Sequence, residues 1–132
     1  MSAGAVSLSA FDEWLAAYSR AAAKDDPAAS VALFADDARY FESPFDEPLI
    51  GREAIYRYWA DGARDLTDRQ ATHEVLALLG SVGIARWRGR FVVRATGEAM
   101  ALDCIFLVEF DEVGRCRLFR EWWHLQKIQN ED

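Results

Sequence analysis

The sequence has few cysteines and no long apolar run, and both shortages exclude classes of protein. Its two cysteines, Cys104 and Cys116, form no Cys-x-x-Cys pair, so neither a disulfide framework nor a thiolate zinc site is expected. No segment approaches the roughly 20 apolar residues that a membrane-spanning helix needs. The first ten residues contain no basic side chain and do not resemble a secretory signal. We therefore expect a cytoplasmic protein with no membrane contact.

Basic side chains are also in the minority. The chain has 15 Lys and Arg against 22 Asp and Glu, which gives a formal charge of −7. Such a surface repels phosphate backbones, so no nucleic-acid partner is expected. His73 and His124 have no partner at metal-ligand spacing, and no glycine-rich phosphate loop is present. We therefore expect neither a bound metal nor a cofactor.

Hydrophobic and aromatic residues, in contrast, are abundant. They make up 52% and 13% of the chain, and the aromatic residues include five Trp and eight Phe. The 132 residues have the size of one ordinary domain, and we find no linker or internal repeat. The composition predicts a single domain over residues 1–132 whose core or cavity is walled with aromatic rings.

The N-terminal half has helical periodicity. Phe11, Trp14, Leu15 and Tyr18 recur on one face of a predicted helix over residues 8–24.

A second helix is expected to begin at Asp26-Pro27, where Asp can cap and Pro suits the first turn, and to continue to Asp36-Asp37. A short strand is expected over 38–42 and a proline-containing loop over 43–50, and Gly51 is expected to open a third helix.

The C-terminal half reads as strands. Long strands are expected over roughly 69–79, 82–94, 99–110 and 115–127, separated by glycines. Three helices followed by a run of strands predict an α+β fold.

Alternation along these strands separates two faces. In the strand over 82–94, Trp87 and Phe91 share a face that must look inward, because Arg86, Arg88 and Arg90 occupy the other. The arginine row is expected to be a solvated face neutralised by acids, or else half of an oligomer contact.

The last two strands can be aligned as a hairpin. A four-residue turn over 111–114 would place Phe106 opposite Phe119 and Cys104 opposite Glu121. The inward face then carries Leu102, Cys104, Phe106, Val108, Phe119, Glu121 and Trp123. The outward face offers an apolar patch, which predicts a homodimer: Ile105, Leu107, Leu118 and Trp122.

Several segments resemble a known superfamily. Val31-Ala-Leu-Phe-Ala-Asp-Asp-Ala38, Asp46-Glu-Pro48, Phe110-Asp-x-x-Gly114 and Glu121-Trp122-Trp123 are similar to those of nuclear transport factor 2-like proteins. The branch suggested holds SnoaL-like polyketide cyclases and ketosteroid isomerase. The resemblance implies helices packed on a strongly curved, mainly antiparallel sheet, which form a cone with an internal pocket, and it also implies a homodimer.

The isomerase pattern fits in part when it is carried over residue by residue. Tyr18 falls at the oxyanion tyrosine, Glu42 at the general base, and Tyr58 and Trp59 at the aromatic pair beside that tyrosine. Phe106 falls where the isomerase has a protonated aspartic acid, so one of two hydrogen-bond donors is missing. In related cyclases an acid on the last strands is the base, and Glu121 is the nearest equivalent.

The candidate site therefore combines acid–base residues with aromatic walls. The catalytic candidates are Glu42, Glu121 and Tyr18. The expected ligand-binding residues are Tyr40, Tyr58, Trp59, Trp87, Phe91, Phe106, Phe119 and Trp123. Structural alternatives remain for each candidate: Tyr18 could be a packed core tyrosine, Glu42 a surface acid, and Glu121 a partner in a structural hydrogen bond to a Trp or Tyr.

Two functions are compatible with these residues. The first is a cofactor-free enzyme that moves a proton on a small apolar molecule, for example a cyclic one, by isomerisation, dehydration, cyclisation or epoxide opening. The second is a ligand-binding or association module without catalysis. A large cavity reached by both carboxyl groups would favour the enzyme, whereas a cone filled by Trp side chains would favour the module.

Overall fold

The protein, seen in a computed structural model, is described over residues 5–129. Its helices are α1 (Leu8–Ala23), α2 (Pro27–Val31) and α3 (Arg52–Asp65). Its strands are β1 (Phe34–Phe41), β2 (Leu49–Ile50), β3 (Leu66–Leu79), β4 (Val82–Val93), β5 (Ala99–Phe110) and β6 (Cys116–Lys127). The predicted bounds of the four long strands are therefore correct to within about three residues.

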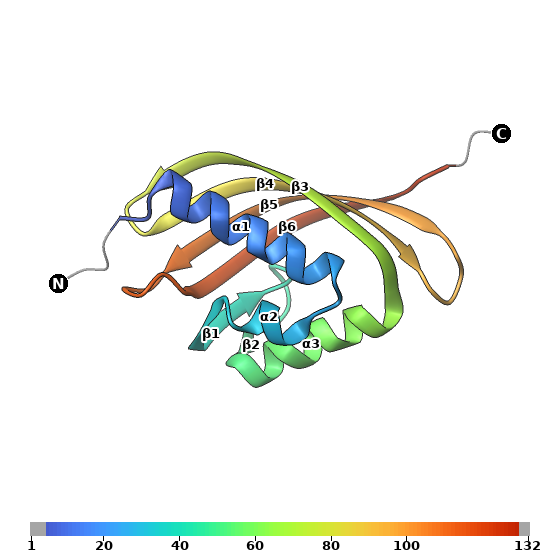
Figure 1. The fold of residues 1–132 in the computed structure, drawn as a ribbon, viewed down its shortest axis with the longest axis horizontal. Helices are drawn as coiled ribbons and strands as arrows, with labels where there is room; N and C mark the ends of the chain where they lie inside the picture. The colour runs from blue at the N-terminus through green and yellow to red at the C-terminus, as the bar shows by residue number, and fades with distance from the viewer. Residues whose placement is uncertain (1–4, 130–132) are drawn as a thin grey trace.

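All six strands belong to one sheet, in the order β2-β1-β6-β5-β4-β3. Neighbouring strands are antiparallel except β1 and β6, which run parallel. In Figure 1 the long strands β3 to β6 curve round α1, and α2 and α3 lie near β1 and β2. The predicted α+β fold, with three helices packed on a curved and mainly antiparallel sheet, is confirmed.

The first helix lies on the inner face of the sheet. Ser7 caps it by accepting a hydrogen bond from the amide of Ala10 at 3.1 Å. Its aromatic side chains are buried against the strands, and the ring of Phe11 lies where a Cβ at Gly83 would be, 2.4 Å away. Glycine at this position of β4 therefore lets the helix lie close to the sheet.

The second helix is shorter than predicted. It ends at Val31, and Phe34 already begins β1, whereas the sequence predicted helix as far as Asp37. The amide of Cys116 donates to the Leu33 carbonyl at 2.9 Å, and the Phe34 side chain is fully buried. Pairing with β6 and burial of this ring outweigh the local helical pattern.

The curvature of the sheet has a visible cause in β3. Its register with β4 shifts between Thr67 and Gln70 and again between Val75 and Ala77. Extra residues in one strand bend it and increase its twist. Because α3 leads directly into this bent strand, the helix is held over one end of the inner face, where the cavity lies.

The hairpin of the last two strands differs in register from the prediction. Phe106 lies opposite Glu121 and not opposite Phe119. The turn has one more residue than expected, since Phe110 pairs with Cys116 and leaves residues 111–115 between them, and the ladder also shifts beside it. The two irregularities together move the register by two residues, so each side chain keeps its predicted face.

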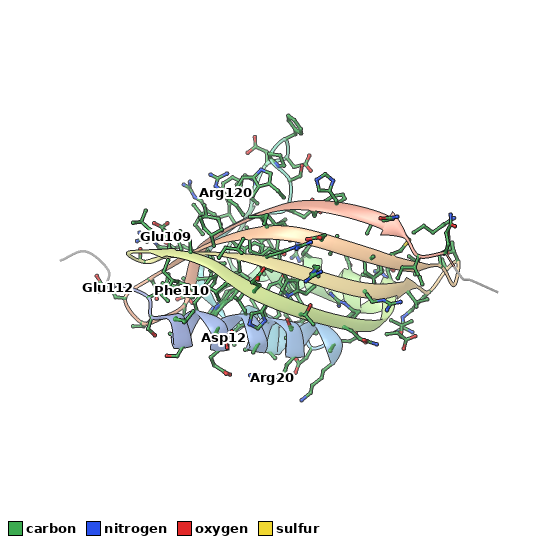
Figure 2. All side chains as sticks on the ribbon, turned by 90° about the horizontal axis from the view of Figure 1, so that it is seen from above. Asp12, Arg20, Glu109, Phe110, Glu112 and Arg120 are labelled. Atoms are coloured by element: carbon green, nitrogen blue, oxygen red, sulfur yellow. The ribbon has the colours of Figure 1, made fainter. Side chains whose placement is uncertain are left out.

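The two faces of the sheet are clearly separated. Figure 2 shows Phe110 between the sheet and α1, whereas Glu109 and Arg120 lie on the opposite side. Arg86 of the predicted arginine row donates to both carboxylate oxygens of Asp103, at 3.0 and 2.6 Å. The outer face therefore carries ion pairs beside its apolar side chains, and the inner face carries the core.

Candidate functional site

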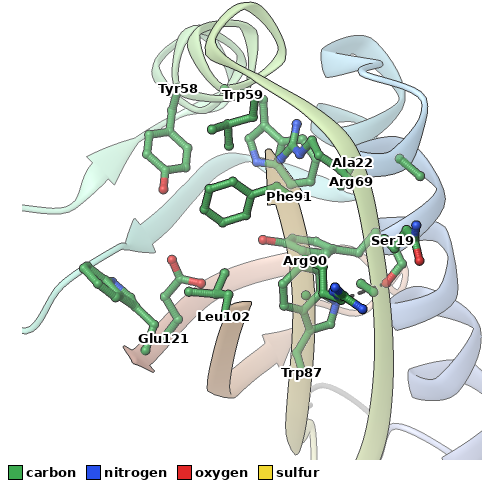
Figure 3. A pocket seen from close by; sticks show the side chains of 18 of the residues that line it. Ser19, Ala22, Tyr58, Trp59, Arg69, Trp87, Arg90, Phe91, Leu102 and Glu121 are labelled. Carbon is green, nitrogen blue, oxygen red and sulfur yellow. Dashed lines mark hydrogen bonds between the residues drawn. The ribbon is translucent and has the colours of Figure 1, made fainter. Parts of the chain in front are cut away.

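A cavity of about 490 Å³ lies between the inner face of the sheet and helices α1 and α3. Figure 3 shows side chains converging on it from separate elements: Tyr58 and Trp59 from α3, Trp87 and Phe91 from β4, and Glu121 from β6. A pocket of this size, with mainly apolar walls and few polar groups, is suited to a compact organic molecule.

Most of the predicted site residues line this cavity. They are Tyr18, Tyr40, Glu42, Tyr58, Trp59, Trp87, Phe91, Glu121 and Trp123. Phe106 and Phe119 do not, and the expectation that they border the cavity is wrong. Both are fully buried behind Tyr18, with ring centroids 5.4 and 5.7 Å from its ring, because each points into the layer between α1 and the sheet.

Two tyrosine hydroxyl groups meet at the inner end of the cavity. The hydroxyl oxygens of Tyr18 and Tyr40 are 3.1 Å apart and share one hydrogen bond. Burial, followed by the nearby Glu121 carboxyl, raises the pKa of both phenols, so both remain protonated. Because two hydroxyl groups share one hydrogen bond, one O–H proton of the pair stays available to a ligand.

The Glu121 carboxyl is the most perturbed acid of the site. Its side chain is only 8% exposed, and within residues 5–129 it makes no hydrogen bond or ion pair. Burial, with a further contribution from Glu42, raises its pKa to about 8. The structural hydrogen bond to a Trp or Tyr, considered above as an alternative, is not formed.

Glu42 lies beside Glu121 because of the parallel pairing of β1 with β6. Phe41 pairs with Arg120, so the two glutamates directly follow paired residues on adjacent strands. The Trp123 indole donates to the Glu42 carbonyl oxygen at 3.0 Å, which fixes the backbone there. Partial burial, and then Asp46, raises the pKa of the Glu42 carboxyl. Glu42 therefore occupies a more open part of the cavity than Glu121.

The sequence did not reveal Arg69, which also lines the cavity. Its guanidinium carbon lies 5.7 Å from the ring centroid of Trp59, and its Nη1 atom lies 3.6 Å from the Asp25 carboxylate. Arg69 falls in the irregular stretch of β3, where the simple alternation of faces does not hold. Arg69 therefore forms a long ion pair with Asp25 and lies over Trp59, and its buried Nη1 atom makes no hydrogen bond within residues 5–129.

Ser19 was missed as well, although it neighbours Tyr18. Its hydroxyl accepts a hydrogen bond from the Trp87 indole at 3.0 Å and holds that ring against the cavity wall. A helical position one residue from an apolar face carries no distinctive signal in the sequence.

The two histidines lie apart from the cavity. His73 Nε2 is 2.7 Å from Asp12 Oδ1 and ties α1 to β3, and His124 pairs across the sheet with Asp103. Over residues 5–129 we find no group of three His, Cys, Asp or Glu side chains arranged to hold a metal ion. In the same part of the chain, every helix is too short or too polar to cross a bilayer.

Helices packed on a curved sheet around an aromatic cavity define a class of small-molecule-binding α+β proteins. The family model of the SnoaL-like domain matches residues 15–119. The chain belongs to the SnoaL-like family, which is part of the nuclear transport factor 2-like superfamily. Ligand-binding and isomerase-type proteins share this fold.

Proposed function

We propose that the protein binds a small apolar molecule in the cavity and moves a proton on it by cofactor-free general acid–base catalysis. The observation that carries this proposal is Glu121, a carboxyl group that lines a 490 Å³ aromatic cavity and has no hydrogen-bond or ion-pair partner among residues 5–129. A carboxyl whose pKa lies near 8 exchanges its proton readily around neutral pH. Glu121 would act as the base or acid, and the nearby Glu42 carboxyl would help to keep its pKa high.

The tyrosine pair complements this role. When a base removes a proton next to a carbonyl or similar group, negative charge develops on the ligand oxygen. Tyr18 is in position to donate a hydrogen bond to that oxygen, and Tyr40 supports it through the shared hydrogen bond. Ketosteroid isomerase has a protonated aspartic acid as its second hydrogen-bond donor, and Phe106 stands at that position here. Tyr40 would therefore supply part of the stabilisation that the missing donor gives.

Reactions of this kind include isomerisation, dehydration, cyclisation and epoxide opening. The non-catalytic module becomes the better description if the cavity binds ligands but Glu121 moves no proton.

A generic substrate tests the proposal before the natural one is known. In 5-nitrobenzisoxazole, a base removes the C3 proton, the N–O bond breaks, and a coloured cyanophenolate forms. We expect kcat/KM to rise with pH through about 8, as Glu121 ionises. Glu121→Gln should lower it by roughly 100-fold or more, and Tyr18→Phe by roughly tenfold.

The control is Glu112→Gln, which removes the same charge from the exposed β5–β6 turn. Its rate should equal that of the wild type. If Glu121→Gln matches the wild type while the probe still binds, general acid–base catalysis by this residue is refuted and only the binding function remains.

We also propose that two copies associate through the outer face of β5 and β6. Ile105 and Trp122 pair across the two strands and are 37% and 45% exposed. Leu107 and Leu118 extend the same face, and large apolar side chains gathered in this way are typical of an interface.

A further inference from the structure

In the part of the chain that the structure describes, the two carboxyl groups of the cavity lack a positive partner. Glu42 and Glu121 follow paired residues on adjacent strands, and no Lys, Arg or His within residues 5–129 lies within 4.0 Å of either carboxylate. Burial and the neighbouring Glu42 carboxyl both disfavour the ionised form of Glu121. A buried acid beside a half-buried one, with no cation within 4.0 Å among residues 5–129, is a costly arrangement that a positively charged ligand would relieve.

Aromatic rings surround the same two carboxyl groups. Tyr58 and Trp123 line the cavity and are still 39% and 42% exposed, so part of each ring remains open to a ligand. Tyr18 and Tyr40 lie at the inner end. Aromatic rings attract cations through their negative faces, and cages of such rings with an acid bind organic ammonium groups.

Other charged groups of both signs line the cavity. Arg69 of β3 lies 3.6 Å from the Asp25 carboxylate and over the Trp59 ring, and Arg90 of β4 is exposed. Asp61 and Asp65 of α3 line the same cavity. The titratable groups that face Glu121 are neutral or acidic. They are Tyr18 of α1, Tyr40 of β1, Glu42 just after β1, Tyr58 of α3 and Cys104 of β5.

We infer that the ligand of this cavity is a small organic ammonium ion whose charged nitrogen lies between Glu42 and Glu121 and whose carbon skeleton contacts the aromatic walls. The inference rests on the proposed function and narrows its ligand class, from an apolar molecule to an apolar carbon skeleton that carries one positively charged nitrogen. It also links binding to chemistry. A positive nitrogen beside Glu42 cancels the repulsion that contributes to the high pKa of Glu121, and so converts Glu121 into the carboxylate that accepts a proton.

Phenyltrimethylammonium and its uncharged isostere tert-butylbenzene are a matched pair of probes, because they differ in shape very little and in charge by one. Binding can be followed by quenching of tryptophan fluorescence, since Trp59, Trp87 and Trp123 line the cavity. At pH 9 the cation should bind at least tenfold more tightly than the isostere. Its affinity should rise between pH 6 and pH 9 as Glu121 ionises.

Variants assign the effect to the two carboxyl groups. Glu42→Gln and Glu121→Gln should each lower the affinity for the cation by tenfold or more. The affinity for the isostere should change by no more than about twofold. Glu112→Gln should change neither. Circular dichroism of each variant checks that it is folded, and retained binding of the isostere shows that the cavity is intact.

Three results would overturn the inference: equal or tighter binding of the isostere, unchanged cation binding in both Gln variants, or preferential binding of phenylacetate, which would indicate an anion held by Arg69. The reaction of 5-nitrobenzisoxazole keeps the two proposals apart. Loss of that reaction in Glu121→Gln without any cation preference leaves catalysis standing and removes the ammonium class. Preferential binding of the cation without that reaction leaves the ammonium class standing and removes catalysis by Glu121.

Discussion

Glu121 shows how one residue can connect stability with function. Its carboxyl group is held among aromatic rings at a strand position that is only 8% exposed, where the charge is poorly solvated. Burial raises its pKa to about 8, whereas an unfolded glutamate titrates near 4.3. The folded protein therefore holds a proton that the unfolded chain releases at lower pH.

This difference predicts how stability depends on pH. Between the two pKa values the folded state binds more protons, so the free energy of unfolding falls as pH rises from about 4.3 to 8. The Glu121 contribution to this fall should be roughly 3–5 kcal/mol. In Glu121→Gln it should be absent, so that the variant becomes more stable than the wild type at pH 9. Urea unfolding at pH 5, 7 and 9 measures this.

Glu112→Gln provides the comparison, since its carboxyl lies on an exposed turn. It should follow the wild type at every pH. A wild type and a Glu121→Gln variant whose unfolding free energies differ by the same amount at pH 5 and pH 9 would contradict the raised pKa of Glu121.

The hydroxyl pair of Tyr18 and Tyr40 offers a second prediction at this scale. Tyr40→Phe removes one partner of a buried 3.1 Å hydrogen bond and leaves the other hydroxyl unsatisfied, which costs about 1–3 kcal/mol. The double variant Tyr18→Phe/Tyr40→Phe should cost less than the sum of the two single variants, because both polar groups are gone. Chemical denaturation of the four proteins completes the cycle, and strictly additive losses would mean that the two hydroxyl groups do not interact.

Residue placement was predictable from the sequence where strand alternation applies. The alternation of side chains along a strand alone places Glu121, Trp87 and Trp123 on the inner face, and the structure has them there. This alternation cannot distinguish a residue that borders a cavity from one packed behind it, which is why Phe119 was assigned to the wall. That distinction depends on where α1 lies on the sheet, a three-dimensional fact with no local signal.

For helices and strands, the sequence-based predictions are wrong where pairing between distant segments decides the structure. Helix α2 stops at Val31 because Phe34 pairs with β6, which lies far along the chain. The register of β5 with β6 moves by two residues because the turn and the ladder beside it are irregular. Periodicity identifies each element, whereas its end and its register depend on contacts that a local pattern does not contain.

The inner face of β4 depends on a glycine as well as on its aromatic rings. A Cβ at Gly89 would lie 2.7 Å from the Trp87 indole, which is stacked on Phe106 with a centroid distance of 5.4 Å. Gly89→Ala should therefore displace Trp87 from its hydrogen bond to Ser19 and destabilise the protein by about 1–3 kcal/mol. Thermal unfolding and the near-ultraviolet circular dichroism of the tryptophans report both effects.

The same substitution made in a Trp87→Phe background is the control. The smaller ring frees the space that the new methyl group needs, so Gly89→Ala should cost clearly less there. An equal cost in both backgrounds would place the effect in the backbone and not in the contact with Trp87.

For the whole molecule, the sheet separates two kinds of apolar surface. Its inner face is covered by α1 and α3 and holds the core and the cavity. No helix among residues 5–129 covers the outer face, on which Glu109 and Arg120 lie (Figure 2). Ile105 and Trp122, paired across β5 and β6, are exposed on this outer face. Ion pairs such as Arg86 with Asp103 lie beside these side chains. A polar margin around an apolar centre is the usual composition of a protein interface.

The last prediction concerns this outer face. If two copies pack through it, Ile105→Glu buries a charge at the centre of the interface and should convert a dimer into a monomer at micromolar concentration, because an unpaired buried charge costs several kcal/mol. Leu79→Glu is the matched control: this leucine is 81% exposed near the β3–β4 turn and lies outside the patch, so its variant should stay dimeric. Sedimentation equilibrium gives the mass of each protein, and unfolding of Ile105→Glu in urea shows whether the monomer keeps its fold. A wild type that sediments as a monomer, or an Ile105→Glu variant that remains a dimer, would mean that association does not use this face.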